Sequence, residues 1–247
     1  MNRDSNRTYI AYVKSLLADH PVDVALKAAV GGDFDQIGSL ERDLLIQQGL
    51  TPNGYLIDVG CGSGRLAKPL AEYLTGKYLG LDIVPELVEY ARQFVGRPDW
   101  RFEVAEGLTI PEADGQADFV CFFSVLTHLL HENSYLYLQE AGRVLKPGGK
   151  IVFSFLEFTI PSLWPVFEAS IRKRDDPDYP LTMFMSRDMI SAWASHLGLK
   201  VEVFADGDKP HIPLSHPISF ENGFVMEEWG FLGQSVCVLS LESSPQS

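Results

Sequence analysis

The sequence is poor in cysteine and has no long uninterrupted apolar run. Its three cysteines, Cys61, Cys121 and Cys237, lie far apart, and none belongs to a C-x-x-C pair. This pattern argues against a disulfide framework and against a cysteine zinc site. The most apolar stretch, residues 119–130, is interrupted by polar side chains and is too short to cross a bilayer. Residues 1–5 lead into no apolar run, so we predict no signal peptide and expect a cytoplasmic protein.

Positive charge is also scarce. The 247 residues include 20 Lys and Arg against 33 Asp and Glu, for a net charge of −13. Broad binding to nucleic acid or to anionic membrane depends on many cationic contacts, so we expect neither a nucleic-acid partner nor membrane insertion. The remaining composition, 46% hydrophobic and 21% charged, is that of an ordinary globular chain. The length suits one large domain, or one domain with a small appendage.

The N-terminal fifty residues have the pattern of amphipathic helices. Tyr9, Tyr12, Val13 and Leu16 recur at spacings of three and four, which places them on one face of a helix. Residues 31–34 interrupt the pattern, and a second helix is predicted over residues 37–48. We therefore predict that residues 1–54 form a helical lid or extension, followed by a second domain over residues 55–247.

From residue 55 onward, short apolar runs alternate with helical stretches. The predicted strands cover residues 55–59, 78–82, 100–104, 118–123 and 150–155, and the predicted helices cover residues 65–74, 85–94 and 134–144, with a turn at 146–149. This alternation predicts an α/β fold with a doubly wound, mostly parallel sheet. Ligands of such sheets bind beyond the carboxyl ends of the strands.

After residue 155 the alternation stops. A helix is predicted from just after Ser186 to about residue 196, with further strands over 200–204 and 234–241. The segments between them, residues 157–181 and 206–230, are rich in proline and polar residues. Because long loops in compact domains are usually functional, we predict that these two cover segments close over the active site.

The most informative segment is a glycine loop at residues 58–64, with the sequence Asp-Val-Gly-Cys-Gly-Ser-Gly. It follows a predicted strand and opens a helix, an arrangement that lets a ligand touch the backbone. Its G-x-G-x-G spacing differs from the G-x-G-x-x-G of dinucleotide enzymes, which counts against an oxidoreductase. Asp58 would repel a pyrophosphate but suits an ammonium group. Asp82, at the end of the next strand, suits ribose hydroxyls. An amino acid joined to a nucleoside fits all of these features.

These segments resemble the class I S-adenosylmethionine-dependent methyltransferases. The resemblance rests on residues 55–66, 78–83, 105–108, 122–129 and 143–150, in the order and spacing of that family, and it covers about residues 55–155. It implies a seven-stranded sheet whose last strand is antiparallel. It also implies S-adenosylmethionine as the cofactor and S-adenosylhomocysteine as its product.

Carried over by position, the resemblance implies a set of cofactor-binding residues: Asp58, Gly60, Cys61, Gly62, Gly64, Asp82, Ile83, Glu106, Gly107, Leu108 and Ser124. In this set Asp58 orients the ammonium and Asp82 holds the ribose, while the glycine backbones pack against the methionine part. Ile83 and Leu108 lie on the two faces of the adenine, and Glu106 reaches its amine. Glu106 departs from the aspartate that is commoner in the family.

His128 is the candidate catalytic residue, because it follows the fourth predicted strand and has an ordinary pKa of about 6.5, suited to a general base. The alternative is a histidine that only bonds to the next helix. His131, His211 and His216 are weaker candidates. Tyr9, Tyr12, Asp33 and Phe34 could reach the cofactor from the N-terminal region. No histidines and carboxylates show zinc spacing, so no metal site is predicted.

The sequence thus predicts methyl transfer to a hydroxyl of a small molecule or a glycan. Two alternatives stay open. One is transfer to an amine of a small molecule or a protein, which needs no base. The other is a protein that binds S-adenosylmethionine without catalysis. Neither the identity of the acceptor nor the oligomeric state follows from the sequence, because one fold carries many functions.

Overall fold

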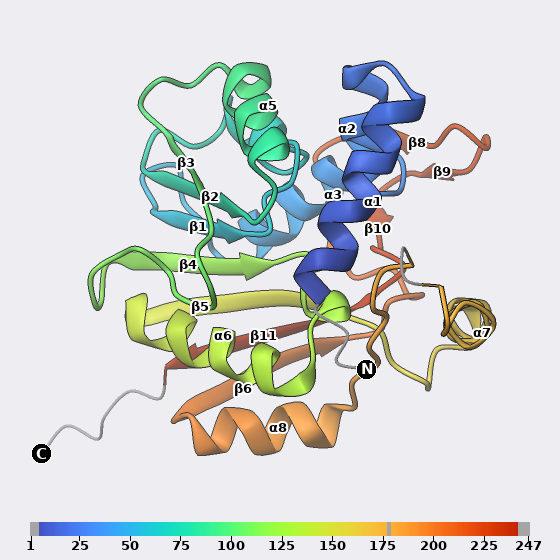
Figure 1. The fold of residues 1–247 in the computed structure, drawn as a ribbon. Helices are drawn as coiled ribbons and strands as arrows, with labels where there is room; N and C mark the ends of the chain where they lie inside the picture. Colours follow the sequence, from blue (N-terminus) through green and yellow to red (C-terminus); the bar gives the residue numbers. More distant parts are fainter. Residues whose placement is uncertain (1–4, 177–178, 242–247) are drawn as a thin grey trace, which may run out of the picture.

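The computed structural model of the chain describes residues 5–176 and 179–241. The predicted lid, the second domain and the first cover segment each extend into residues outside these ranges, namely 1–4, 242–247 and 177–178. Figure 1 shows a central sheet with helices on both faces and a pair of N-terminal helices standing at one edge.

The sheet has seven strands in the order β3-β2-β1-β4-β5-β11-β6. Their bounds are β1 Leu56–Val59, β2 Tyr78–Asp82, β3 Arg101–Val104, β4 Ala117–Phe122, β5 Leu145–Phe155, β6 Leu199–Ala205 and β11 Ser235–Leu241. All neighbours are parallel except β11, which pairs antiparallel with β5 and with β6. The predicted fold class, with its antiparallel last strand, is confirmed.

The central strands are covered on both faces. Every residue of β1 and β2 is buried, as their continuous apolar runs predict for parallel strands. Leu56 belongs to one core cluster and Ile57 to another, since successive side chains of a strand point to opposite faces. The strand order reverses between β1 and β4, so the carboxyl ends of these two strands frame the crevice where such sheets bind ligands.

Helices cover the two faces of the sheet in two groups. The helices α3 Phe34–Gln47, α4 Ala67–Leu70 and α5 Pro85–Val95 contribute to one cluster, and α6 His131–Val144 and α8 Arg187–His196 contribute to the other. α5 follows its predicted bounds closely, with proline at its start and Gly96 in the left-handed conformation at its end. Among the helices of the described residues, none is long and apolar enough to cross a membrane.

The N-terminal region forms three helices where the sequence predicted two. α1 spans Ser5–Asp19 and α2 spans Val22–Ala29, with Pro21 between them. Proline cannot donate a backbone hydrogen bond, so α1 cannot continue through it. Val13 of α1 and Leu26 of α2 pack against Val84 and Leu87, at the end of β2 and the start of α5. This contact holds the helix pair above the carboxyl edge of the sheet (Figure 1).

Two local predictions were wrong. The helix predicted over residues 65–74 is helical only over Ala67–Leu70, and turns flank it. The turn predicted at residues 146–149 lies inside β5 as a bulge, because Ala117 pairs with Leu145 and Phe119 pairs with Lys150. The two glycines of this segment permit the bulge.

The two cover segments contain regular structure. Residues 157–181 include the short 3-10 helix η2 Pro161–Leu163 and the helix α7 Trp164–Arg172. Residues 206–230, predicted as one long loop, carry four short strands: β7 Ile212–Pro213, β8 Ile218–Ser219, β9 Val225–Met226 and β10 Trp229–Gly230. These strands pair as β7 with β10 and β8 with β9. Because the segment is rich in proline and polar residues, its sequence pattern did not predict these short strand pairs.

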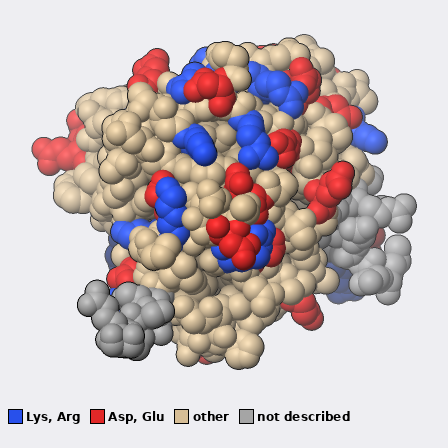
Figure 2. All heavy atoms as spheres, turned by 90° about the vertical axis from the view of Figure 1, so that its left-hand side faces the viewer, with Lys and Arg blue, Asp and Glu red and all other residues tan. Residues whose placement is uncertain are grey.

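The edge of the sheet at the amino ends of the strands carries interleaved charges. Arg101 pairs with Glu103 and Glu112, and Arg143 pairs with Asp114. Figure 2 shows cationic and acidic side chains beside one another on this face. The cations here are therefore neutralised locally by acids.

Candidate functional site

A cavity opens at the carboxyl ends of β1, β2 and β4, and its empty space is about 950 Å³ with the open solvent at its mouth included. Its walls come from the three strand ends, from the short 3-10 helix η1 Leu126–His128 and from the N-terminal helices. Tyr9 of α1 and Val30 after α2 contribute to the wall on the N-terminal side. Most of its surface is apolar, as in small-molecule sites, and a few polar groups converge within it.

The cavity brings together more than half of the predicted site residues. Asp58, Gly60, Cys61, Asp82, Ile83, Ser124 and His128 line it. Gly62, Gly64, Glu106, Gly107 and Leu108 are outside the lining of the cavity as the described residues form it. Gly64 instead packs on α5, where an added Cβ would lie 3.3 Å from the Cβ of Ala91. Glu106 is exposed beside the cavity, and its role toward a ligand stays a prediction.

Backbone amides of the glycine loop donate hydrogen bonds to the end of β2. The N–H groups of Gly60 and Cys61 both donate to the carbonyl oxygen of Leu81, at 2.7 and 2.9 Å. Gly60 has a φ of +78°, and a Cβ there would meet the Val125 side chain at 2.2 Å. The N–H of Gly62 donates to Asp82. These amides are therefore engaged, which argues against a phosphate at this loop and agrees with a ligand without one.

Asp82 lies at the end of β2 and faces the cavity. Its Oδ1 accepts a hydrogen bond from the Val84 N–H and its Oδ2 accepts one from the Gly62 N–H, each at 3.0 Å. Burial raises the pKa of Asp82 to about 6, although these amides favour the charged form. The carboxylate is thus held rigidly in a place where hydrogen-bond donors on a ligand would stabilise its charge.

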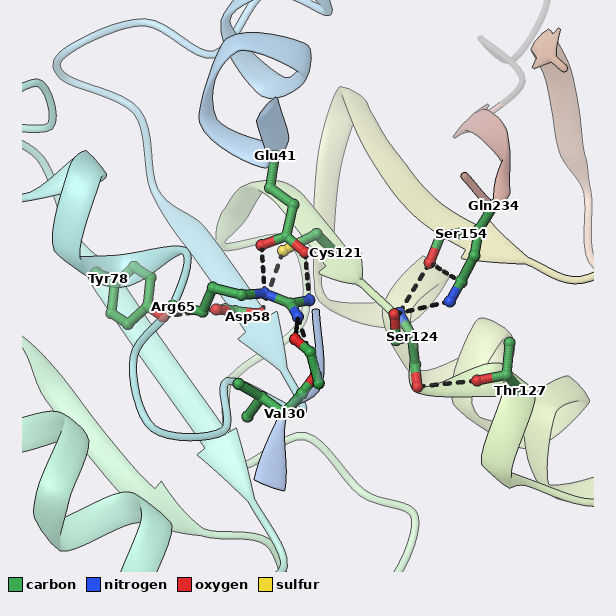
Figure 3. A network of polar contacts seen from close by, with 11 residues as sticks. Val30, Glu41, Asp58, Arg65, Tyr78, Cys121, Ser124, Thr127, Ser154 and Gln234 are labelled. Atoms are coloured by element: carbon green, nitrogen blue, oxygen red, sulfur yellow. Dashed lines mark hydrogen bonds and ion pairs between the residues drawn. The ribbon is translucent and has the colours of Figure 1, made fainter. Parts of the chain in front are cut away.

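Asp58 lies in β1, directly before the glycine loop. Its Oδ2 accepts a hydrogen bond of 2.7 Å from the Tyr78 hydroxyl, and its Oδ1 is 3.4 Å from the Cys121 sulfur (Figure 3). Burial raises the pKa of Asp58 to about 7, and the Tyr78 hydrogen bond opposes that rise. Such a carboxyl gains most from a cationic ligand, because a positive charge nearby would offset the cost of burying its negative charge.

A buried ion pair joins the N-terminal helices to the glycine loop. Nη2 of Arg65 lies 2.5 Å from Oε1 of Glu41, and its Nε lies 3.3 Å from Oε2. Nη1 of Arg65 also donates to the carbonyl oxygens of Val30 and Gly31 (Figure 3). Sequence reasoning missed this pair. Arg65 adjoins the glycine loop, which was an available signal, but nothing in α3 distinguishes Glu41 from a surface glutamate.

His128 lines the cavity in one defined tautomer. Its Nδ1 lies 2.7 Å from the carbonyl oxygen of Leu181, at the end of the first cover segment. A carbonyl oxygen can only accept, so Nδ1 carries the hydrogen and Nε2 is left as an acceptor. Burial lowers the pKa of His128, which keeps the ring neutral near pH 7. The Tyr9 ring stacks beside it, with centroids 6.2 Å apart.

The weaker candidates lie elsewhere. His131 bonds to the carbonyl oxygen of Phe184. His211 bonds to the Lys209 carbonyl and His216 to the Ser215 hydroxyl, both within the second cover segment. Phe34 packs against Phe94 of α5, with ring centroids 5.9 Å apart. Of the four N-terminal candidates, only Tyr9 reaches the cavity wall. In the part of the chain that the structure describes, no three His, Cys, Asp or Glu side chains gather as a metal site.

Replacing Asp58 by asparagine should change how stability depends on pH. Its folded-state pKa of about 7 lies above the ordinary 3.8, so between these values the folded state keeps a proton that the unfolded state releases. The free energy of unfolding of the wild type therefore falls as pH rises through this window. Urea unfolding should therefore show that the difference in free energy of unfolding, variant minus wild type, rises by about 2–3 kcal/mol between about pH 5 and about pH 8.

Asp99→Asn is the matched control. The neighbouring Arg97 lowers the pKa of the exposed Asp99 carboxyl, so the contribution of Asp99 to stability changes with pH in the opposite direction. Equal pH profiles for wild type and the Asp58 variant would show that Asp58 titrates as it does in the unfolded chain.

Comparison with known proteins agrees with this geometry. The family model described as "Methyltransferase domain" matches residues 57–153. An O-methyltransferase from Penicillium expansum is 27% identical over 121 residues, which are 47% of this chain and 43% of that protein. The ubiquinone biosynthesis O-methyltransferase of Xanthomonas oryzae is 28% identical over 156 residues, 60% of this chain and 63% of that protein. This chain therefore spans less than two thirds of either relative.

Among solved structures, magnesium protoporphyrin IX methyltransferase from Synechocystis, with bound S-adenosylhomocysteine, superposes with a TM-score of 0.63. The match covers 97% of this chain and 98% of that one at 17% identity, so it shows a shared fold.

Proposed function

Because this chain contains a methyltransferase domain and has the class I S-adenosylmethionine-dependent methyltransferase fold, we propose that it transfers a methyl group to a hydroxyl of a small molecule or a glycan. The observation that carries the proposal is the pairing, in one cavity, of two buried carboxylates at the ends of β1 and β2 with a histidine whose Nε2 is free to accept a proton.

The cavity fits the cofactor chemically. S-adenosylmethionine supplies a methyl group on a sulfonium, and it also carries an ammonium and two ribose hydroxyls. Buried carboxyls whose pKa burial has raised, Asp58 and Asp82, are suited to positive charge and to hydroxyl donors. The amides of Gly60, Cys61 and Gly62, which could otherwise bind phosphate, are engaged. We assign Asp82 to the ribose hydroxyls, Asp58 to the ammonium side, and Ile83 to the adenine.

His128 acts as the general base in this proposal. Its Nδ1–H is held by the Leu181 carbonyl, so Nε2 would take the proton that the acceptor hydroxyl loses when its oxygen gains the methyl group and the sulfonium, losing that group, becomes a neutral thioether. Tyr9, whose ring stacks beside His128, and Leu129 line the cavity with apolar surface near this point. Holding the reacting atoms in line can by itself supply roughly 7–11 kcal/mol of the barrier.

A hydroxyl acceptor is favoured over an amine because a neutral amine needs no base, while this cavity holds one. The names of the two relatives as O-methyltransferases support the same choice. We also propose that residues 1–54 act as a lid on the domain over residues 55–247. The support is Tyr9 and Val30 in the cavity wall and the Arg65 hydrogen bonds to the end of α2.

Calorimetric titration with S-adenosylhomocysteine tests the cofactor part of the proposal. Wild type should bind it, and Asp82→Ala should weaken the affinity by about 10- to 100-fold, because hydrogen bonds to a charged group contribute about 1.5–3 kcal/mol each. Asp114→Ala, an exposed acid at the opposite edge of the sheet, is the control and should bind as wild type does. Binding of NAD in place of S-adenosylhomocysteine would refute the assignment.

A further inference from the structure

A polar network holds the backbone at the end of β4 in an unusual conformation. Ser124 has a φ of +59°, and it is the only residue other than glycine with positive φ in the described part of the chain. Its N–H donates to Oγ of Ser154 at 2.8 Å, and its carbonyl accepts from the Thr127 hydroxyl at 3.0 Å. Oγ of Ser124 accepts from Nε2 of Gln234 at 3.1 Å (Figure 3). A strained residue held by this many bonds is typical of a functional site.

The direction of every hydrogen in this network follows from burial. Ser154 in β5 is 2% exposed, so its hydroxyl hydrogen needs an acceptor inside the protein. That acceptor is Oε1 of Gln234, at 2.8 Å. The amide of Gln234 must therefore turn its Nε2 toward Ser124, which uses a lone pair of Ser124 Oγ. No group of the network accepts the hydrogen of the Ser124 hydroxyl. Because Ser124 lines the cavity, this hydrogen is available to a ligand.

The resemblance placed Ser124 among the cofactor-binding residues, but Ser124 lies in the cavity wall on the other side of β1 from Asp82. Asp58 and Asp82 lie at the carboxyl ends of β1 and β2, whereas Ser124 lies two residues after β4, across the point where the strand order reverses. Only three residues separate Ser124 from His128, which also lines the cavity. A hydrogen-bond donor and a proton acceptor thus lie on the same short segment of the wall.

We infer that Ser124 donates its hydroxyl hydrogen to an oxygen of the acceptor molecule beside the hydroxyl that faces His128. The favoured acceptors are then compounds in which the methylated hydroxyl adjoins a second, hydrogen-bond-accepting oxygen. Three acids line the cavity, Glu41, Asp58 and Asp82, against one arginine, Arg65, and this balance favours a neutral second oxygen over an anionic one. Gln234 is the positioning residue that fixes the Ser124 hydroxyl. This inference rests on the proposed function and narrows its substrate class.

A pair of probes that differ at one group tests the inference by binding. Catechol has a second oxygen beside its hydroxyl, and 2-methylphenol has a methyl group of similar size there. Their dissociation constants are measured by NMR titration of the protein saturated with S-adenosylhomocysteine. Wild type should bind catechol about five- to tenfold more tightly, as expected for one hydrogen bond.

Two variants should remove this preference. Ser124→Ala deletes the donor. Gln234→Glu keeps the side-chain size but replaces the amide donor by a carboxylate oxygen, which would capture the Ser124 hydrogen. In both, the ratio of the two constants should fall to about one, while the affinity for S-adenosylhomocysteine stays within about twofold of wild type. Ser191→Ala, which changes an exposed serine of α8 bonded to the Arg187 carbonyl, is the matched control and should keep the preference.

Other outcomes overturn the inference. These are a wild-type ratio near one, a ratio unchanged in both variants, or a loss of S-adenosylhomocysteine affinity in Ser124→Ala, which would show that the hydrogen serves the cofactor carboxylate. Wild type that binds S-adenosylhomocysteine without a Ser124-dependent preference refutes this inference alone. Wild type that does not bind S-adenosylhomocysteine refutes the proposed function and the inference with it.

Discussion

We expect His128→Ala to lower kcat by about 10²- to 10⁴-fold with a hydroxyl acceptor, the range that general-base catalysis contributes. The reason is that Nε2 of His128 is, in our proposal, the atom that takes the proton from the acceptor. Because the residue acts on the acceptor, the affinity for S-adenosylhomocysteine should change little. The measurement is steady-state turnover with a methyl acceptor found by screening, together with calorimetry.

The pH profile gives an independent test of the same role. Burial lowers the pKa of His128, so the acid limb of kcat/KM in the wild type should lie below the ordinary value of about 6.5. The acid limb of kcat/KM should be missing from His128→Ala. His211→Ala, in the second cover segment, is the control and should keep both turnover and the limb. Turnover of His128→Ala within twofold of wild type would exclude His128 as the base.

The second large effect concerns stability. Glu41→Ala should lower the free energy of unfolding by about 3–5 kcal/mol, because it leaves the Arg65 guanidinium buried without its counter-charge. The Arg65 side chain is only 10% exposed and the Glu41 side chain 3% exposed, so the remaining guanidinium would be poorly solvated. Urea unfolding at neutral pH measures the change.

Two further variants separate charge from packing. Glu89→Ala breaks the exposed pair with Arg92 and should cost no more than about 0.5 kcal/mol. Replacing both members of the buried pair, Glu41→Leu with Arg65→Met, should recover much of the loss, because the uncompensated charge is gone. A loss in Glu41→Ala as small as in Glu89→Ala would show that water reaches Arg65.

The strands from β1 to β5 could be predicted from the sequence because their signals are local. Each strand is a short apolar run next to glycine, proline or polar residues, and a parallel sheet places every strand end at the same edge. The positions of Asp58 and Asp82 in the cavity wall follow from that rule. The sequence could also place His128 there, since it lies in the short segment that follows β4.

The remaining wall of the cavity depends on contacts between distant segments. Glu41 reaches Arg65 only because α3 packs over the glycine loop. Gln234 meets Ser124 and Ser154 only because β11 pairs with β5. No spacing in the sequence predicts either of these contacts. The split between α1 and α2 is different, because Pro21 was a visible signal that the helical periodicity around it obscured.

The place of β11 in the sheet also bears on how the chain folds during synthesis. β11 lies between β5 and β6, so β6 has no partner strand until residues 235–241 have been made. During translation, the glycine loop, the two residues of the buried ion pair and the first five strands would emerge from the ribosome long before the sheet could be completed. Pairing over such sequence distances is slow, and the open edge of β5 is exposed to other chains meanwhile. Gln234, directly before β11, would join Ser124 only when β11 pairs with β5, so the part of the cavity that we propose selects the acceptor would form after the rest.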